Sequence, residues 1–275
     1  MILKEKSIQI LEVIAIFKFL STSKLLTLNI SNHKPNLVRP IKDLLFYNLI
    51  WKLTFGVDPK RGKLENIYYL KSKWVKFLQD ELNYNEDSKT IKYPIWTSSM
   101  FFRDYHHRLA TIQFNIRLFI YLVQNNWTIK TFDTYFDKIG SNRIDANLKA
   151  KTKLIFKDGS YFIPDAICLY EKENKPHIIT FEIYRGKDTK RVIKQLTSHL
   201  KALSEGLASK VFNKKIGSKT VILFETREAM TSVIKRFNQD SIFSNFDNCF
   251  IFNYLENCDL DMNSWIDCYS NNIKL

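Results

Sequence analysis

The chain has 275 residues, of which 45% are hydrophobic and 14% aromatic, as in folded globular proteins rather than disordered chains. Lys and Arg number 42 against 28 Asp and Glu, and the resulting net charge of +14 favours a polyanionic partner, which we expect to be double-stranded DNA. The four cysteines form no CxxC pair, which argues against a zinc site and a disulfide framework. No apolar run approaches the ~18 residues of a membrane span, and the N-terminus lacks a signal-peptide pattern. We therefore expect a cytoplasmic protein with no membrane partner.

The positive charge is concentrated in the N-terminal third. Residues 1–79 contain 14 Lys and Arg but 5 Asp and Glu, a net of +9. A small DNA-docking domain has this charge density. The alternative explanation of this positive charge is an AT-rich genome, in which Lys, Asn, Ile and Phe are over-used regardless of what the protein binds.

The pattern of residues 1–79 predicts three short helices and a β-hairpin. Apolar residues at helical spacing predict a first helix over about 4–20, and Ser21 or Thr22 can cap a second helix that runs to Leu28. A third helix begins near Asn36, and Pro40 is close enough to its start to be tolerated. Strands are predicted at 49–55 and 66–70, joined by a turn. This order is typical of a winged helix-turn-helix, whose third helix enters the major groove while the hairpin tip meets the DNA backbone.

The candidate DNA contacts lie on the third helix and on the hairpin tip. On the helix they are His33, Lys34, Asn36, Arg39 and Lys42, and on the hairpin they are Lys60, Arg61 and Lys63. The alternative is that these are ordinary solvated charges, or that the module binds protein. The element order together with the local charge favours DNA.

The remaining chain predicts a second, larger domain. We expect a first domain over 1–79, a polar linker over 80–95 and a second domain over 96–275. A helix predicted at 72–83 would begin at the end of the first domain. Its predicted elements are a helix at 104–126, three strands within 148–184, a helix at 188–206, a strand at 219–226, a helix at 227–239 and a strand at 249–255. Strands that give way to strand-helix-strand alternation predict an α/β (α+β overall) fold, with a mixed sheet flanked by helices.

Two carboxylates in this domain form the candidate active site. Asp165 follows a proline at the start of one predicted strand, and Glu182 lies near the end of the next. If the strands pair, the two side chains can converge, with Glu182 and Tyr184 on one face and Ile183 on the other. Two carboxylates suit Mg²⁺, for which Mn²⁺ can substitute, and the ion would activate water against a phosphodiester. The alternative is that Asp165 ends a Pro-Asp turn and Glu182 forms a surface ion pair.

Such sites usually carry a lysine two residues after the second carboxylate, and here that position is Tyr184. Lys187 is the candidate replacement among the catalytic residues, with Arg185, Lys190 and Lys153 as further cations close in sequence or on the preceding strand. Tyr184 could instead attack DNA covalently, but the histidine cluster that accompanies such a tyrosine is not found near it.

The stretches "IPDAICLYE" and "ITFEIYRGKDTKRVIKQLTSHLKAL" resemble the core of the replication-relaxation family, which includes MobC-type relaxases. The likeness extends to "HHRLATIQFNIRL", "WTIKTF" and "KTVILFET". It implies a winged helix joined to a restriction-endonuclease-like PD-(D/E)XK domain, with Asp165 and Glu182 as metal ligands. It also implies a helix over "TFDTYFDK", where an acidic residue of the family would be Asp133 or Asp137.

The resemblance implies a DNA-binding protein of plasmid or mobile-element replication and mobilisation that nicks DNA in a Mg²⁺-dependent reaction. Other replication or mobilisation proteins would be partners, and a homodimer is one option for the assembly. The alternatives are a non-catalytic DNA-binding regulator or architectural protein with a degenerate nuclease fold, and a protein-interaction module.

Overall fold

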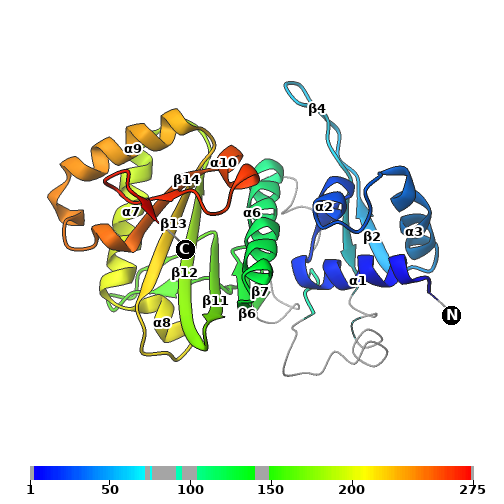
Figure 1. Ribbon diagram of the computed structural model, residues 1–275, viewed down its shortest axis with the longest axis horizontal. Coiled ribbons are helices and arrows are strands. Elements are labelled where there is room, and N and C mark those ends of the chain that lie inside the picture. The colour runs from blue at the N-terminus through cyan, green and yellow to red at the C-terminus, as the bar shows by residue number, and fades with distance from the viewer. Residues whose placement is uncertain (1–2, 72–74, 76–90, 95–103, 140–148, 274–275) are drawn as a thin grey trace. The chain divides into compact units, whose positions relative to one another are not determined.

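A computed structural model describes residues 3–71, 75, 91–94, 104–139 and 149–273 (Figure 1). The chain divides into two compact units, Met1–Ile116 and Arg117–Leu275. The division falls within the helix α6 (Tyr105–Gln124). Most of the helix expected at 72–83 and of the linker expected at 80–95 lies outside the described residues.

The first unit contains the predicted succession of helices and hairpin. Its elements are α1 (Glu5–Phe17), β1 (Leu20–Ser21), α2 (Thr22–Thr27), α3 (Pro35–Phe46), β2 (Ile50–Leu53), β3 (Val57–Asp58), β4 (Gly62–Lys63) and β5 (Ile67–Leu70). The short strands β1, β5 and β2 form an antiparallel sheet with β5 in the middle. Apolar side chains at helical spacing, such as Ile10 and Ile14 of α1 and Leu37 of α3, are buried in the core of this unit.

Three local details differ from the expectation. The first helix ends at Phe17 because Lys18 has a positive φ of 70°, which a right-handed helix cannot continue. Ser21 occupies the N-cap position of α2 without a capping hydrogen bond from its side chain, and Glu65 accepts a hydrogen bond from the Ser23 amide instead (3.3 Å). Pro40 lies inside α3 rather than near its first turn.

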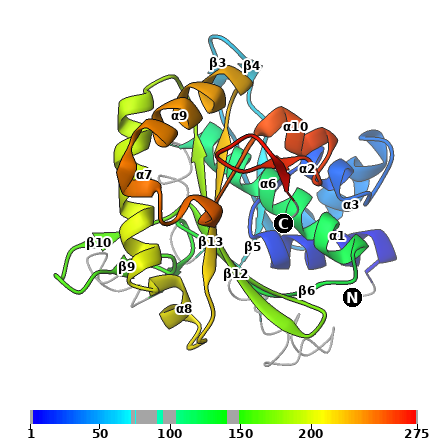
Figure 2. The same cartoon turned by 60° about the vertical axis from the view of Figure 1, so that its left-hand side comes forward.

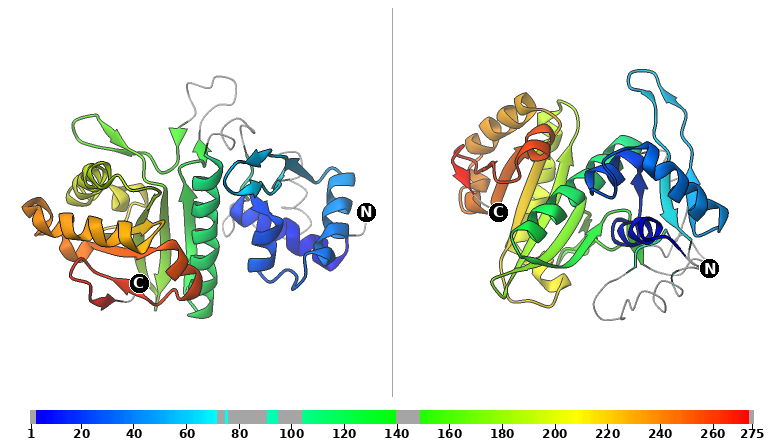
Figure 3. Two further views of the ribbon diagram at one scale, coloured as in Figure 1. Left: turned by 90° about the horizontal axis from the view of Figure 1, so that it is seen from above. Right: turned by 45° about the vertical axis from the view of Figure 1, so that its right-hand side comes forward.

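The strands β3 and β4 form a hairpin that projects from the three-stranded sheet of the first unit (Figures 1 and 3). Asp58 shapes its turn by accepting hydrogen bonds from the amides of Lys60 (2.8 Å) and Arg61 (3.0 Å). Gly62 follows with a φ of 79°, a conformation that favours glycine.

The second unit is built on a seven-stranded mixed sheet, as predicted. Its strands are β6 (Thr128–Thr134), β11 (Ala166–Lys172), β12 (Lys175–Tyr184), β13 (Ser218–Phe224), β14 (Phe250–Tyr254), β15 (Trp265–Ile266) and β16 (Asn272–Ile273). Their order is β16-β15-β14-β13-β12-β11-β6. The three central strands β12, β13 and β14 run parallel, and the other pairings are antiparallel.

Two helices join the parallel strands and lie beside each other on the sheet (Figures 1 and 2). The helix α7 (Thr189–Ser204) connects β12 to β13, and α9 (Arg227–Gln239) connects β13 to β14. Apolar side chains of both helices, including Leu196 and Phe237, join Phe224 and Phe252 of the sheet in one buried core.

Shorter elements complete the second unit. They are the hairpins β7 (Lys138–Ile139) with β8 (Lys149–Ala150) and β9 (Leu154–Ile155) with β10 (Tyr161–Phe162), the helices α8 (Leu207–Val211) and α10 (Leu255–Leu260), and the 3-10 turns η3 (Ser241–Phe243) and η4 (Asp247–Cys249). None of the helices in the described ranges has the length and apolar character that a membrane crossing requires.

The helix expected over residues 131–138 is wrong. Residues 128–134 form the strand β6, which pairs with β11 along its length. This segment contains three Thr and one Ile, and their branched side chains suit a pleated strand. The three strands expected within 148–184 are also divided more finely, into β8, β9, β10, β11 and β12.

Candidate metal site and nucleic-acid surface

The strand pairing brings Asp165 and Glu182 together. Asp165 directly precedes β11, and its amide donates hydrogen bonds to the carbonyl of Phe181 on β12 (3.1 Å) and to Oε2 of Glu182 (3.4 Å). The carboxylate of Asp165 in turn accepts a hydrogen bond at Oδ2 from the amide of Ile183 (2.8 Å). Each acidic side chain is thus bound to backbone of the neighbouring segment, and the predicted convergence is present.

Both carboxyl groups are buried, with 7% of Asp165 and 6% of Glu182 exposed. Burial raises the pKa of Glu182 well above its ordinary value, and the nearby Asp165 carboxylate raises this pKa further. No lysine or arginine in the described part of the chain forms an ion pair with Glu182. Two buried acids whose charges interact are stabilised by a proton on one of them or by a bound cation.

His199 of α7 lies against the same pair. Its Nε2 atom is 3.3 Å from Oε2 of Glu182. The ring of Phe162 packs edge-on against the imidazole, with 4.5 Å between the ring centres. Only 1% of His199 is exposed, and burial lowers its pKa to about 3. The imidazole is therefore neutral and contributes a hydrogen bond but no positive charge.

Tyr184 shares the face of β12 that carries Glu182, as predicted from the strand period. Its hydroxyl is buried and makes no hydrogen bond with the described residues. Burial raises the pKa of Tyr184 well above its ordinary value, with further increases from Glu182 and Asp165. A neutral phenol supplies neither the fixed charge of a lysine nor a ready phenolate nucleophile.

The candidate replacement cations lie elsewhere. Lys187 is exposed. Arg185 forms an ion pair with Glu225 (3.1 Å), and the ammonium of Lys153 lies 3.8 Å from the ring centre of Tyr161.

Arg191, which the sequence did not single out, lies in the first turn of α7 and is exposed. Burial and the Asp165 carboxylate raise the pKa of Glu182, and the charge of Arg191 has a smaller, opposite effect on this pKa.

The two further acids of the expected helix have other roles. Asp133 on β6 pairs with Lys151 (3.4 Å), and Asp137 accepts hydrogen bonds from the amide and hydroxyl of Thr134 (2.9 and 2.8 Å). Within the described ranges, no three His, Cys, Asp or Glu residues are grouped to hold a metal ion. The candidate donor set remains the predicted pair, Asp165 and Glu182, and Mg²⁺ is an ion commonly held by one or two carboxylates together with several waters.

The candidate DNA contacts on α3 are exposed. Asn36, Arg39 and Lys42 are on the outer side of the helix, and His33 and Lys34 directly precede it. None of these five side chains forms an ion pair or a side-chain hydrogen bond with the described residues. Leu37, Ile41 and Leu44 form the opposite, buried side.

On the β3–β4 hairpin, Lys60, Arg61 and Lys63 are exposed, and Arg61 has a hydrogen-bond partner, His106, within the first unit. Nδ1 of His106, at the start of α6, lies 3.3 Å from Arg61, while its Nε2 lies 2.8 Å from Oδ2 of Asp58. Because arginine can only donate, Nδ1 accepts and Nε2 carries the proton. His106 therefore connects the hairpin to α6, a role the sequence did not indicate.

No family model, curated protein or solved structure matches this chain. The resemblance to the replication-relaxation family therefore rests on the motifs quoted above.

Proposed function

We propose that the chain is a DNA-binding protein of plasmid or mobile-element replication and mobilisation that nicks DNA in a Mg²⁺-dependent reaction. The supporting observation is the meeting of two buried carboxylates, Asp165 and Glu182, on segments that are 17 residues apart in the chain. Such a pair is unfavourable without a bound proton or cation, and a divalent cation that replaces the proton would stabilise both carboxylates.

DNA would be held by the first unit in the manner of a winged helix. Its order of three helices and a hairpin supports this assignment, as do the cations on and just before α3, which have no ion-pair partner among the described residues. The β3–β4 hairpin would be the wing, with Lys60 and Lys63 toward the phosphates. Major-groove docking by α3 would position the duplex, while phosphate contacts would supply most of the affinity.

The second unit would act as a nuclease-like domain. Asp165 and Glu182 would hold Mg²⁺, which when bound polarises a phosphodiester oxygen and lowers the pKa of a coordinated water. His199 would keep Glu182 oriented through its hydrogen bond at Oε2.

The proposal is tested by a nicking assay on supercoiled plasmid with Mg²⁺, Mn²⁺ or EDTA. Asp165→Asn and Glu182→Gln keep the shape of the buried site and remove one charge each, so both should abolish divalent-dependent nicking. Asp133→Asn, which removes a carboxylate from the same sheet outside the pair, should nick like the original chain. If nicking is absent, or if it persists in both site variants, the proposed nuclease activity is contradicted.

The second candidate is a non-catalytic DNA-binding regulator or architectural protein. It is favoured by Tyr184, which leaves the usual lysine position without a charge, and by the low exposure of both carboxylates. In that case, specific DNA binding measured by gel shift should survive Asp165→Asn combined with Glu182→Gln, with no cleavage under any divalent ion.

A further inference from the structure

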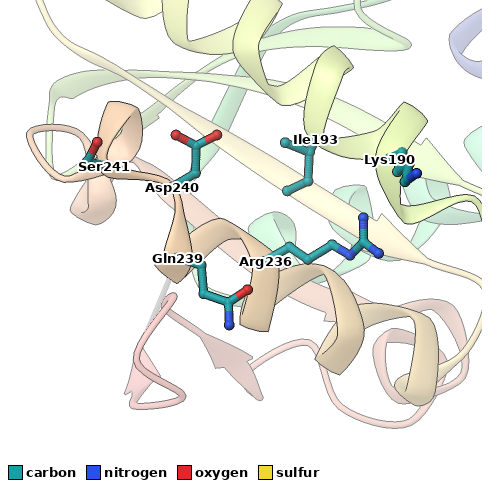
Figure 4. A pocket seen from close by; sticks show the side chains of 6 residues that line it. All are labelled: Lys190, Ile193, Arg236, Gln239, Asp240 and Ser241. Atoms are coloured by element: carbon teal, nitrogen blue, oxygen red, sulfur yellow. The ribbon is translucent and has the colours of Figure 1, made fainter.

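A second charged feature of the second unit is an open cleft between α7 and α9, of about 630 Å³ (Figure 4). Lys190 and Ile193 of α7 form one wall, and Arg236 and Gln239 of α9 form the other. Asp240 and Ser241, which follow α9, line one end. None of these residues belongs to the carboxylate pair or to the candidate DNA contacts of the first unit.

The cleft has two cations at one end. Figure 4 shows the guanidinium of Arg236 directed along the cleft toward Lys190. Neither cation forms an ion pair or hydrogen bond with the residues that the structure describes. Lys190 also lies in the first turn of α7, where the helix dipole adds positive potential. Two like charges that face one cleft repel each other, and an anion between them would remove that repulsion.

The remaining lining is apolar and hydrogen-bonding. Ile193 lies between the cationic end and the end formed by Asp240 and Ser241 (Figure 4). The carboxylate of Asp240 is oriented by its own turn, since Oδ1 accepts a hydrogen bond from the Ile242 amide (3.2 Å). A ligand that fills this cleft therefore joins an anionic group to a flat or apolar part that carries hydrogen-bond donors.

We propose that the cleft binds a nucleotide unit. The phosphate would lie between Arg236, whose planar guanidinium pairs with two oxygens, and Lys190, which acts as a point charge. The sugar and base would cover Ile193, and a sugar hydroxyl or base amino group would donate to Asp240. This site does not depend on the carboxylate pair being catalytic. The nucleotide is either a free mononucleotide or one residue of a DNA strand.

The experiment compares a double variant with a matched control. Lys190→Ala combined with Arg236→Ala removes both cations of the cleft. Lys194→Ala combined with Lys235→Ala removes the same charge from the same two helices at exposed positions that do not line the cleft. Circular dichroism melting verifies that both proteins are folded. Calorimetric titration then uses inorganic phosphate, deoxyadenosine monophosphate and a single-stranded oligonucleotide as probes.

The cleft variant should bind the nucleotide at least about tenfold more weakly, because two charge-assisted contacts are lost. The control should stay within about twofold. Loss of mononucleotide binding identifies a free nucleotide as the ligand, and loss of oligonucleotide binding alone identifies a DNA strand. Binding of phosphate as tight as that of the nucleotide would contradict contacts with sugar and base. Equal loss in both variants, or no binding of any probe to the original chain, overturns the site.

Discussion

Oε2 of Glu182 accepts a hydrogen bond from the amide of Asp165 at 3.4 Å, although 17 residues separate the two. The Asp165 carboxylate is held in turn by the amide of Ile183. Backbone groups of adjacent segments therefore position both acids, and their separation is set by the sheet rather than by flexible side chains. This arrangement makes their charges strongly interdependent, and the first two predictions follow from it.

Neutralising one acid should stabilise the protein when divalent ions are absent. At a pH above the folded pKa of Glu182, we expect Glu182→Gln to raise the free energy of unfolding in EDTA by about 1 kcal/mol or more, since it removes a buried charge beside another. Mg²⁺ should stabilise the original chain, by about 2.7 kcal/mol at a hundred times its dissociation constant, but not this variant. Thermal unfolding with and without Mg²⁺ measures both effects.

Glu171→Gln is the matched control, because Glu171 pairs with Lys130 at the surface. It should keep the response to Mg²⁺. If Mg²⁺ stabilises neither the original chain nor the control, the carboxylate pair is not a metal site.

Glu182 and His199 should give stability opposite dependences on pH. The pKa of Glu182 is raised above 4.5, so its stabilising proton is fully present below pH 4.5 and is lost as the pH rises through the folded pKa. The pKa of His199 is lowered from 6.5 to about 3, so its contribution is complete above pH 6.5 and is lost as the pH falls toward 3. Between pH 4.5 and 6.5 the two effects oppose each other.

Removing Glu182 or His199 should reveal the effect of the remaining group on the pH dependence of stability. Across pH 4.5–6.5, Glu182→Gln should lose stability on acidification more steeply than the original chain, while His199→Gln should lose less or gain. Each slope is at most about 1.4 kcal/mol per pH unit for one proton. Urea unfolding at several pH values measures the change in the free energy of unfolding per pH unit for each protein. His33→Gln, at an exposed position, should leave the slope unchanged. The same slope in all four proteins would show that neither buried group titrates as described.

The proposed wing should contribute to the salt dependence of DNA binding. Lys60→Ala combined with Lys63→Ala should weaken binding and make the slope of log K against log salt less steep by about 0.9 for each lost phosphate contact. Lys214→Ala combined with Lys215→Ala removes the same charge at exposed positions of the second unit and serves as the control. Fluorescence anisotropy at several salt concentrations gives the slopes. An unchanged slope in the wing variant would place the hairpin away from the phosphates.

Phe237 should be essential to the attachment of α9. It is 2% exposed, stacks on Phe243 with 4.2 Å between ring centres, and also contacts Phe250 and Phe252. Phe237→Ala should therefore reduce the free energy of unfolding by about 3–5 kcal/mol. Phe46→Ala makes the same substitution at a side chain that is 83% exposed. This control should change the free energy of unfolding by about 0.5 kcal/mol or less. Urea unfolding distinguishes the two, and similar small losses in both would contradict the packing of α9.

Much of the local structure was predictable from the sequence. The helix over Arg227–Gln239 begins after Thr226, whose side chain accepts a hydrogen bond from the Ala229 amide, and its apolar residues recur at helical spacing. The alternation along β12 similarly placed Glu182 and Tyr184 on one face. Both inferences succeed because caps and side-chain periods act within a single element.

Contacts between elements were harder to predict, and the meeting of Asp165 with Glu182 was expected only on the condition that their strands pair. Residues 128–134 are a strand because β11 is available to pair with them. The sequence alone determined which side chains share a face of an element. Only the tertiary structure decided which faces meet, because hydrogen bonding and burial between elements depend on residues far apart in the chain.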